Sequence, residues 1–205
     1  MSHHGSPSAP AETAPVVVIP VKAFRQAKLR LADHLDEHER IDLAQSMASG
    51  VVRAAVGMDV RVVCDDPDVT RWARSTGAGV IEVSSSGLNP AVTEALQVLQ
   101  GEGVDLVMIC HGDLPLATSL HGIGKPGLVT IVPDRHLQGT NVLVVPTRAG
   151  FSFHYGPGSL HRHVEEALRC GLDVEIHQIA ALQWDVDTPD DLDDQPPTTD
   201  EGGSV

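Results

Sequence analysis

Residues 16–21 read VVVIPV, and the basic stretch KAFRQAKLR (22–30) follows without a break. A continuous apolar run rich in β-branched residues is typical of a strand that is buried on both faces of a parallel sheet. The basic stretch holds four of the 14 Lys and Arg residues of a chain whose formal net charge is -14. Cations gathered directly after such a strand indicate a site for a polyanion such as a triphosphate, and a solvated basic turn is the alternative.

Segments with strand and helix patterns alternate along the rest of the chain. Residues 37–56 carry apolar side chains at steps of three and four, which predicts an amphipathic helix. Further strands are expected at 60–64, 80–83, 106–110, 128–132, 141–145, 174–179 and 182–186, and further helices at 67–75, 89–99, 159–170 and after 188. This order predicts an α/β fold in which helices cover both faces of a mostly parallel, mixed central sheet.

Size and composition indicate one domain. The chain has 205 residues, of which 41% are hydrophobic. We expect a single domain over 15–194, between a proline-rich disordered segment at 1–14 and an acidic disordered tail at 195–205. No apolar run approaches the ~20 residues of a membrane span, and no secretory signal is recognisable, so we expect a cytoplasmic protein without a membrane partner.

Charge and cysteine content narrow the class of protein further. The acidic balance argues against nucleic acid as a partner, because phosphate backbones require a basic surface. Cys64, Cys110 and Cys170 are widely spaced and lie in apolar contexts. We therefore expect them to be buried free thiols.

Two motifs place carboxylates at the ends of predicted strands. Asp113 follows a buried strand within HGDLP, and Asp185 and Asp187 stand two positions apart in WDVDTP. Alternate residues of an extended segment point to the same side, and close carboxylates repel each other unless a cation lies between them. Since ligands bind outside the carboxyl ends of strands in such sheets, the pattern indicates a Mg²⁺ site near the basic stretch. Helix capping is the alternative for these side chains.

Two polar loops contain glycines that permit close approach to a ligand. The first is DRHLQGT at 134–140, and the second is FHYGPGSLHRH at 153–163. A helix that begins after Gly-Ser offers free N–H groups to a phosphate, although an ordinary turn and cap would show the same pattern. The chain has no Walker A or Gly-x-Ser-x-Gly motif and no Gly-x-Gly-x-x-Gly directly after a predicted strand, and its histidines lack zinc-finger spacing.

Taken in order, these stretches resemble the guanylyltransferase family of deazaflavin (factor-420) coenzyme biosynthesis, whose members join GTP to 2-phospho-L-lactate or phosphoenolpyruvate. The resemblance covers about residues 16–192. The matching residues are P-V-K at 20–22, K-x-R-L at 28–31, Asn89, G-D-L-P at 112–115, D-R at 134–135, G-T at 139–140, G-P-x-S at 156–159, R-H at 162–163 and D-V-D-T-P at 185–189.

The resemblance implies a three-layer, Rossmann-like fold of the nucleotidyltransferase type and a role for each matching residue. Mg²⁺ is expected on Asp113, Asp185 and Asp187. The small phosphorylated acid is expected on Thr140, Gly156 and Ser159. The nucleotide is expected to contact Lys22, Lys28, Arg30 and Asn89. The expected catalytic residues are Asp113, Lys22, Lys28 and Arg30.

The implied reaction is an in-line attack by a phosphate oxygen of the acid on the α-phosphorus of GTP, with release of pyrophosphate. No general base is needed, because the nucleophile is already ionised at pH 7. Another nucleotidyltransferase of the same fold, of the molybdenum-cofactor or sugar-phosphate type, is one alternative, and a non-catalytic nucleotide-binding domain is another. The identity of the acid, the strictness of the GTP preference and the oligomeric state stay open.

Overall fold

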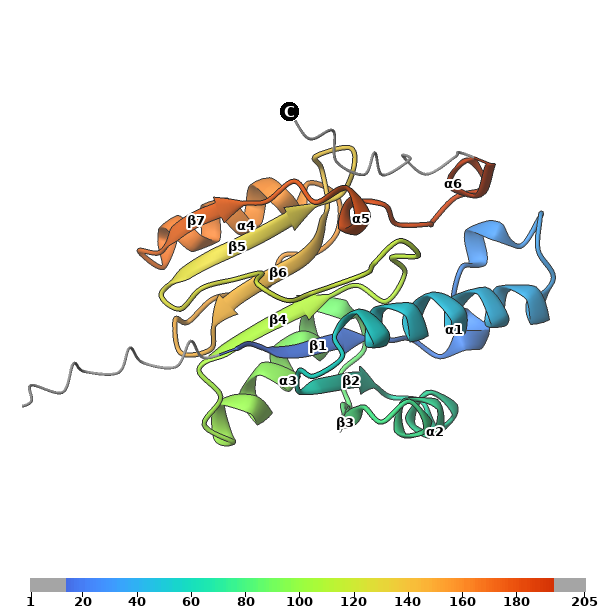
Figure 1. The fold of residues 1–205 in the computed structure, drawn as a ribbon, viewed down its shortest axis with the longest axis horizontal. Helices are drawn as coiled ribbons and strands as arrows, with labels where there is room; N and C mark the ends of the chain where they lie inside the picture. Colours follow the sequence, from blue (N-terminus) through green and yellow to red (C-terminus); the bar gives the residue numbers. More distant parts are fainter. Residues whose placement is uncertain (1–13, 194–205) are drawn as a thin grey trace, which may run out of the picture.

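The computed structural model describes residues 14–193, and apart from Ala14 the segments expected to be disordered lie outside the described residues. Within that range one sheet has the strand order β3-β2-β1-β4-β6-β5-β7 (Figure 1). The strands are β1 (Val16–Pro20), β2 (Val60–Cys64), β3 (Gly79–Glu82), β4 (Leu106–Cys110), β5 (Leu128–Pro133), β6 (Thr140–Pro146) and β7 (Asp173–Ile176). The helices are α1 (Glu37–Ala54), α2 (Pro67–Ser75), α3 (Leu88–Gly101), α4 (Ser159–Arg169), α5 (Ala180–Gln183) and α6 (Pro189–Asp193), with 3₁₀ turns η1 (Phe24–Gln26) and η2 (Leu29–Leu31).

The sheet is mixed, as the sequence predicts. β1 pairs in parallel with both β2 and β4, and β2 pairs in parallel with β3. β6 runs antiparallel to its neighbours β4 and β5, and β7 is parallel to β5. The carboxyl ends of β1, β2 and β4 therefore meet at one edge of the sheet, where ligands bind in open α/β sheets.

The central strand β1 is buried on both faces, which explains its uninterrupted apolar sequence. Val16 and Val18 pack in the core cluster that includes the apolar side of α3. Val17 and Ile19 pack in the opposite cluster, which includes Val51 of α1. Helices thus cover both faces of the sheet, and the predicted three-layer α/β architecture is confirmed (Figure 1).

The segment 182–186 is not the strand that its alternating apolar residues predict. Residues 180–183 form α5, and the following residues cross the ends of the strands instead of pairing along one. Leu182 is fully buried, and Val186 N–H donates to the carbonyl of Asp113 at 3.3 Å. β5 is paired on both sides, with β6 and β7, so this segment could not have paired with β5.

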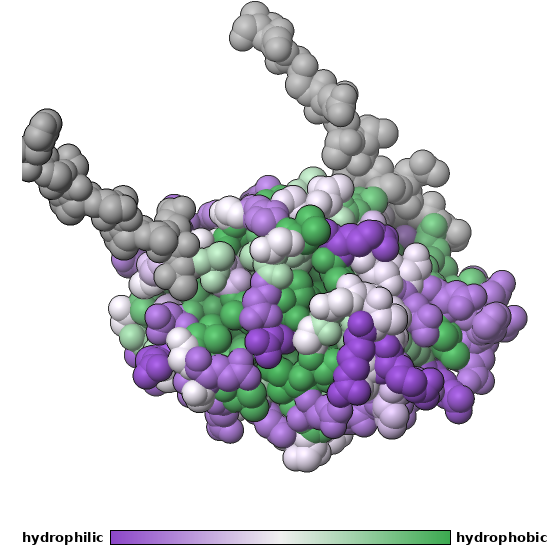
Figure 2. All heavy atoms as spheres, turned by 60° about the horizontal axis from the view of Figure 1, so that its bottom comes forward, coloured by the Kyte–Doolittle hydropathy of each residue, from purple (hydrophilic) through white to green (hydrophobic). Residues whose placement is uncertain are grey.

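The surface carries apolar as well as charged groups. Figure 2 shows hydrophobic side chains exposed on one face, with hydrophilic side chains around them. Cys64 and Cys110 are buried as expected, but Cys170 is partly exposed, because it caps the end of α4. No helix between residues 14 and 193 combines the length and the apolar character needed to cross a membrane.

Candidate functional site

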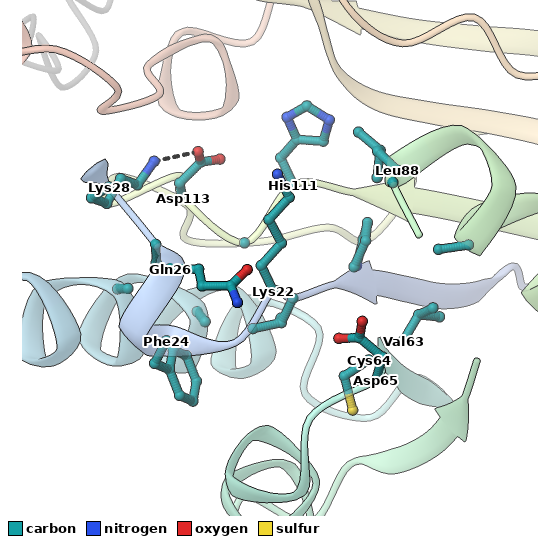
Figure 3. Close-up of a pocket in the computed structure, with 18 of the residues that line it drawn as sticks. Lys22, Phe24, Gln26, Lys28, Val63, Cys64, Asp65, Leu88, His111 and Asp113 are labelled. Atoms are coloured by element: carbon teal, nitrogen blue, oxygen red, sulfur yellow. Dashed lines mark hydrogen bonds and ion pairs between the residues drawn. The ribbon is translucent and has the colours of Figure 1, made fainter. Parts of the chain in front are cut away.

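A pocket of about 400 Å³ opens at the carboxyl ends of β1, β2 and β4 (Figure 3). Each of these strands delivers polar side chains to it from the residues that directly follow the strand. Its polar lining comprises Lys22, Gln26, Lys28, Asp65, Ser85, His111, Asp113 and Asp187. The basic stretch and two of the predicted metal carboxylates are therefore brought to one site.

Lys28 forms the central contact of this pocket. Its Nζ lies 2.6 Å from Asp113 Oδ2 and 2.9 Å from Asp187 Oδ1, and its side chain is 8% exposed. Burial alone would lower the pKa of Lys28, but the charges of the two carboxylates outweigh it and raise the pKa above its ordinary value. The ammonium is therefore charged and lies between two carboxylates that the sequence assigns to a metal ion.

The backbone of Lys28 has an uncommon conformation. Its φ of 53° and ψ of 35° place it in the left-handed region, which non-glycine residues seldom occupy. This turn separates η1 from η2 and directs the side chain toward Asp113 (Figure 3). Arg30, two residues on, is largely exposed, and its Nη1 lies 3.9 Å from Asp187 Oδ2.

Asp113 has room for a second ligand besides Lys28. Its Oδ1 is buried and has no hydrogen-bond partner among the described residues. Burial alone would raise the pKa of Asp113, but Lys28 and His111 lower it below its ordinary value. An ionised carboxylate with one buried, unpartnered oxygen is a suitable ligand for a hard cation.

Asp185 lies close to the other two carboxylates. Burial is the main cause of the raised pKa of Asp185, and the negative charge of Asp113 adds to it. Asn141 Nδ2 donates to Asp185 Oδ1 at 3.4 Å. A cation shared by these carboxylates would remove the repulsion, so the donor chemistry fits Mg²⁺.

The same carboxylates are not arranged as a finished metal site. Among residues 14–193, no group of three or more His, Cys, Asp and Glu side chains is close enough together to hold a metal ion. The Lys28 ammonium occupies the position between Asp113 and Asp187 instead. A metal ion that used these same two oxygens would have to displace Lys28, whereas Asp113 Oδ1 is free of it.

Arg135, from the predicted D-R match, orders the segment that carries Asp185 and Asp187. Its Nη1 donates to the carbonyl of Asp185 at 3.0 Å, and its guanidinium lies 4.3 Å from the ring centre of Trp184. Arg135 also forms an ion pair with Asp191. Asp191 in turn accepts the backbone N–H of Asp187 at 2.7 Å, which fixes the segment on both sides.

Asn89 contacts protein backbone in this structure. Its Nδ2 donates to the carbonyl of Tyr155 at 3.2 Å, and its Oδ1 accepts the N–H of Tyr155 at 2.7 Å. It does not line the pocket of about 400 Å³ that holds Lys22 and Lys28. The side chain thus joins the start of α3 to the loop before Gly156. It lines a neighbouring hollow together with Ser85, and the expected nucleotide contact stays a prediction.

The three residues expected to bind the small acid lie beside this pocket and do not line it. Gly156 is exposed, but Thr140 and Ser159 are buried, with 1% and 2% of their surfaces exposed. Ser159 N–H donates to the carbonyl of Gly156, and Leu160 N–H donates to that of Gln138. Two N–H groups at the start of α4 are therefore already used and are not free for a phosphate.

Thr140 is held by a buried histidine. His154 N–H donates to His163 Nε2 at 3.0 Å, so Nε2 carries no proton and the neutral ring is protonated at Nδ1. His163 Nδ1 then donates to Thr140 Oγ1 at 3.0 Å. Burial lowers the pKa of His163 to about 4, with a smaller effect from His154, so the ring is neutral at pH 7.

A row of rings connects this region with the pocket. His111 lines the pocket, and its ring centre lies 5.3 Å from that of Tyr155, which lies 4.8 Å from that of His163. His111 Nε2 and Tyr155 Oη are buried without a hydrogen-bond partner in the described part of the chain. Sequence reasoning missed both residues, although His111 directly precedes the matched G-D-L-P.

Gly139 has a structural explanation. A Cβ at this position would lie 2.6 Å from Asp134 Oδ2, and that oxygen accepts the N–H of Gly139 at 2.8 Å. The glycine therefore lets the loop close on the Asp134 carboxylate. Its place in the sequence motif does not by itself indicate contact with a ligand.

Comparison with known proteins agrees with this fold. The family described as "Guanylyl transferase CofC like" matches residues 15–195. A phosphoenolpyruvate guanylyltransferase of Rubrobacter xylanophilus is 35% identical over 184 residues, which is 85% of this chain and 90% of the relative. One of Conexibacter woesei is 37% identical over 188 residues, or 86% and 84% of the two chains. A 2-phospho-L-lactate guanylyltransferase of Methanocaldococcus infernus is 27% identical over 180 residues, or 85% and 81%.

Solved structures with the same arrangement have low sequence identity. A putative nucleotide-diphospho-sugar transferase from Desulfovibrio desulfuricans has a TM-score of 0.66 at 17% identity, covering 87% of this chain and 84% of its own. A 4-diphosphocytidyl-2C-methyl-D-erythritol synthase has a TM-score of 0.58 at 13% identity, covering 89% and 96%. These likenesses confirm the predicted nucleotidyltransferase-type fold.

Proposed function

The chain belongs to the family of CofC-like guanylyl transferases, and on this premise we propose that it transfers the guanylyl group of GTP to a small phosphorylated carboxylic acid and releases pyrophosphate. The observation that carries the proposal is the meeting of a charged, buried lysine with two aspartates at one end of a pocket. Cations and metal-binding carboxylates at one place are what phosphoryl-type transfer requires, because charge develops on both leaving and attacking oxygens.

Phosphoenolpyruvate is the acid that the comparisons favour. The relatives at 30–37% identity carry the name phosphoenolpyruvate guanylyltransferase, as in Conexibacter woesei and Chloroflexus aggregans. Those at 27% and 29%, from Methanocaldococcus, carry the name 2-phospho-L-lactate guanylyltransferase. The greater similarity to the first group supports phosphoenolpyruvate over 2-phospho-L-lactate.

We assign the nucleotide phosphates to the lysine end of the pocket. Lys22 is exposed and extends along the pocket wall, and Lys28 is charged beside Asp113 (Figure 3). Both ammonium groups can donate to phosphate oxygens, and Arg30 adds a third cation at the rim. As the triphosphate enters, Lys28 exchanges a carboxylate contact for phosphate oxygens and stabilises the leaving pyrophosphate.

Asp113, Asp185 and Asp187 would hold Mg²⁺, which when bound neutralises charge on the triphosphate. The buried, unpartnered Oδ1 of Asp113 supports this assignment. The raised pKa of Asp185 supports it too, because the cause is burial beside other carboxylates. Arg135 keeps Asp185 and Asp187 in place from the other side.

We assign the phosphorylated acid to the side of His111 that faces Tyr155 and Gly156. Gly156 is exposed and can be reached directly. Thr140 and Ser159 are buried, so they reach the acid only when the turn at 156–158 shifts. The phosphate of the acid is ionised at pH 7 and needs no base.

Pyrophosphate release tests the proposal. The purified chain is incubated with GTP, MgCl₂ and phosphoenolpyruvate, 2-phospho-L-lactate or 3-phosphoglycerate, and the products are identified by mass spectrometry. We expect release with phosphoenolpyruvate and a product containing one guanylyl group per acid. Chelation of Mg²⁺ should stop it. Binding of GTP without release with any acid would favour a non-catalytic nucleotide-binding domain.

A further inference from the structure

The pocket has two chemically different ends (Figure 3). One end holds Lys28 and Asp113, and the other holds Asp65, with Lys22 between them. Asp65 follows β2 and Asp113 follows β4, on either side of the central strand β1. The two strands are two spacings apart, each about 4.8 Å, which leaves room for a nucleoside between the carboxylates.

Asp65 is a carboxylate without a protein partner at the wall of this pocket. Asp113 and Asp187 are paired with Lys28, and the neighbouring Asp66 caps α2 by accepting from the N–H groups of Asp68 and Val69. Asp65 is exposed, and among the side-chain hydrogen bonds and ion pairs of residues 14–193 none uses its carboxylate. In a pocket that takes up a polyanion, an unpaired carboxylate repels the ligand unless the ligand presents donors to it.

The rest of the lining at this end suits a flat, largely apolar ring. Pro20, Val63, Cys64, Val83 and Ala91 line the pocket beside Asp65. Val63 and Cys64 are packed into the core, with 2% and 3% of their surfaces exposed, so the part of the pocket wall that they form is rigid. Ligand pockets commonly combine an apolar lining with a few polar groups that fix orientation, in volumes of about 300–1,000 Å³.

We propose that Asp65 selects the guanine base, by accepting hydrogen bonds from its N1–H and its 2-amino group. These adjacent donors match the two oxygens of a carboxylate, which accepts and never donates when ionised. Adenine presents an unprotonated N1 at the same place and leaves the carboxylate unpaired. The inference rests on the proposed function, which makes GTP the nucleotide, and it adds the residue that distinguishes GTP from ATP.

The substitution Asp65→Asn tests this proposal, because it should weaken the binding of GTP and strengthen the binding of XTP. A carboxamide accepts at one atom and donates at the other, so it faces the 2-amino group of guanine with a donor. Xanthine carries an oxygen in place of that amino group and matches the carboxamide. We expect affinity for GTP to fall about 10- to 100-fold and affinity for XTP to rise about tenfold, the range for one or two hydrogen bonds to a charged group.

Inosine triphosphate separates the two hydrogen bonds, because it lacks the 2-amino group but keeps N1–H. The unchanged chain should bind ITP about tenfold more weakly than GTP, as one charge-assisted hydrogen bond is lost. Asp68→Asn is the matched control. It removes the same charge three positions away, from a side chain that is paired with Arg71 on the surface, and it should leave the order GTP, ITP, XTP unchanged.

Nucleotide binding is measured by calorimetry, and turnover is measured separately. Equal binding of GTP and ATP by the unchanged chain would overturn the inference, and so would an equal loss of all four nucleotides in Asp65→Asn, since this would place Asp65 on the ribose. If the preference switches to XTP but no guanylyl product forms with any acid, the proposed function fails while the assignment of Asp65 stands.

Discussion

Lys28 Nζ donates to Asp113 Oδ2 at 2.6 Å across 85 positions of sequence. The contact joins the loop after β1 to the loop after β4, which follow neighbouring parallel strands. Asp187 completes the arrangement at 2.9 Å, from a segment that crosses the strand ends. One internal cation therefore balances two carboxylates that would otherwise repel each other at the edge of the sheet.

Replacement of Lys28 by Met should destabilise the ligand-free chain and make it more dependent on Mg²⁺. Removing one partner of a fully buried pair costs about 3–5 kcal/mol, and we expect about 1–2 kcal/mol here because Asp187 is half-exposed. Urea unfolding with and without MgCl₂ measures both effects. Added Mg²⁺ should restore more stability to Lys28→Met than to the unchanged chain, because the vacant position accepts the ion.

The matched control for this change is Lys125→Met. Lys125 pairs with Glu175 on the surface, where its side chain is 60% exposed. Exposed pairs contribute about 0–1 kcal/mol, so this variant should unfold at nearly the same urea concentration with or without Mg²⁺. An equal response of both variants to Mg²⁺ would contradict a specific exchange of Lys28 for the metal ion.

Asp113→Asn should abolish turnover while the chain stays folded. The amide oxygen can still accept from Lys28, but the negative charge that a metal ion needs is lost. We expect pyrophosphate release to fall by about 100-fold or more, the usual effect of removing an electrostatic group at a reacting centre. Asp105→Asn, at an exposed position at the other end of β4, serves as control, and Asp113→Asn with ordinary turnover would refute the assignment.

The strand β1 could be predicted from sequence because its burial on both faces leaves an unbroken apolar run. The sequence also predicted that the loops carrying Lys28 and Asp113 lie near each other, since both loops follow strands that end at the same edge of the sheet. The ion pair itself could not be predicted, because it depends on the left-handed backbone of Lys28. Nothing in the sequence marks that turn, which has no glycine at its centre.

A short sequence pattern can fit two different structures. The alternation of Leu182, Trp184 and Val186 fits a strand as well as it fits the short helix α5 and the irregular segment that the structure forms there. Asn89 fits a polar ligand contact, yet both of its side-chain atoms bond the backbone of Tyr155. A short-range pattern cannot show which distant backbone groups need a partner.

The stability of the chain should fall in acid partly through His163. Its folded-state pKa of about 4 lies below the ordinary value of 6.5, so the unfolded chain binds a proton first. The neutral His163 ring makes its full contribution to the free energy of unfolding above pH 6.5, and this contribution is lost as the pH falls toward 4. The full loss is about 3 kcal/mol, at 1.36 kcal/mol for each unit of difference between the two pKa values.

Urea unfolding of His163→Asn between pH 7 and pH 4.5 checks this. The variant starts less stable at pH 7, but it should lose less stability than the unchanged chain as the pH falls, because this titration is gone. His161→Asn is the matched control, since His161 lies on the same helix with its side chain 79% exposed. Parallel pH curves for His163→Asn and the unchanged chain would show that His163 is not the titrating group.

Asn89→Ala should loosen the loop before Gly156 and affect the acid more than the nucleotide. The substitution removes two hydrogen bonds to Tyr155, and each typically contributes about 0.5–1.5 kcal/mol. Because Asn89 does not line the pocket around Lys22 and Lys28, we expect KM for phosphoenolpyruvate to rise about tenfold while KM for GTP changes less than about twofold. Thr93→Ala, one turn further along α3 with its hydroxyl bonded within the helix, should change neither constant. A rise in KM for GTP alone would instead indicate that Asn89 contacts the nucleotide, as the sequence motif predicts.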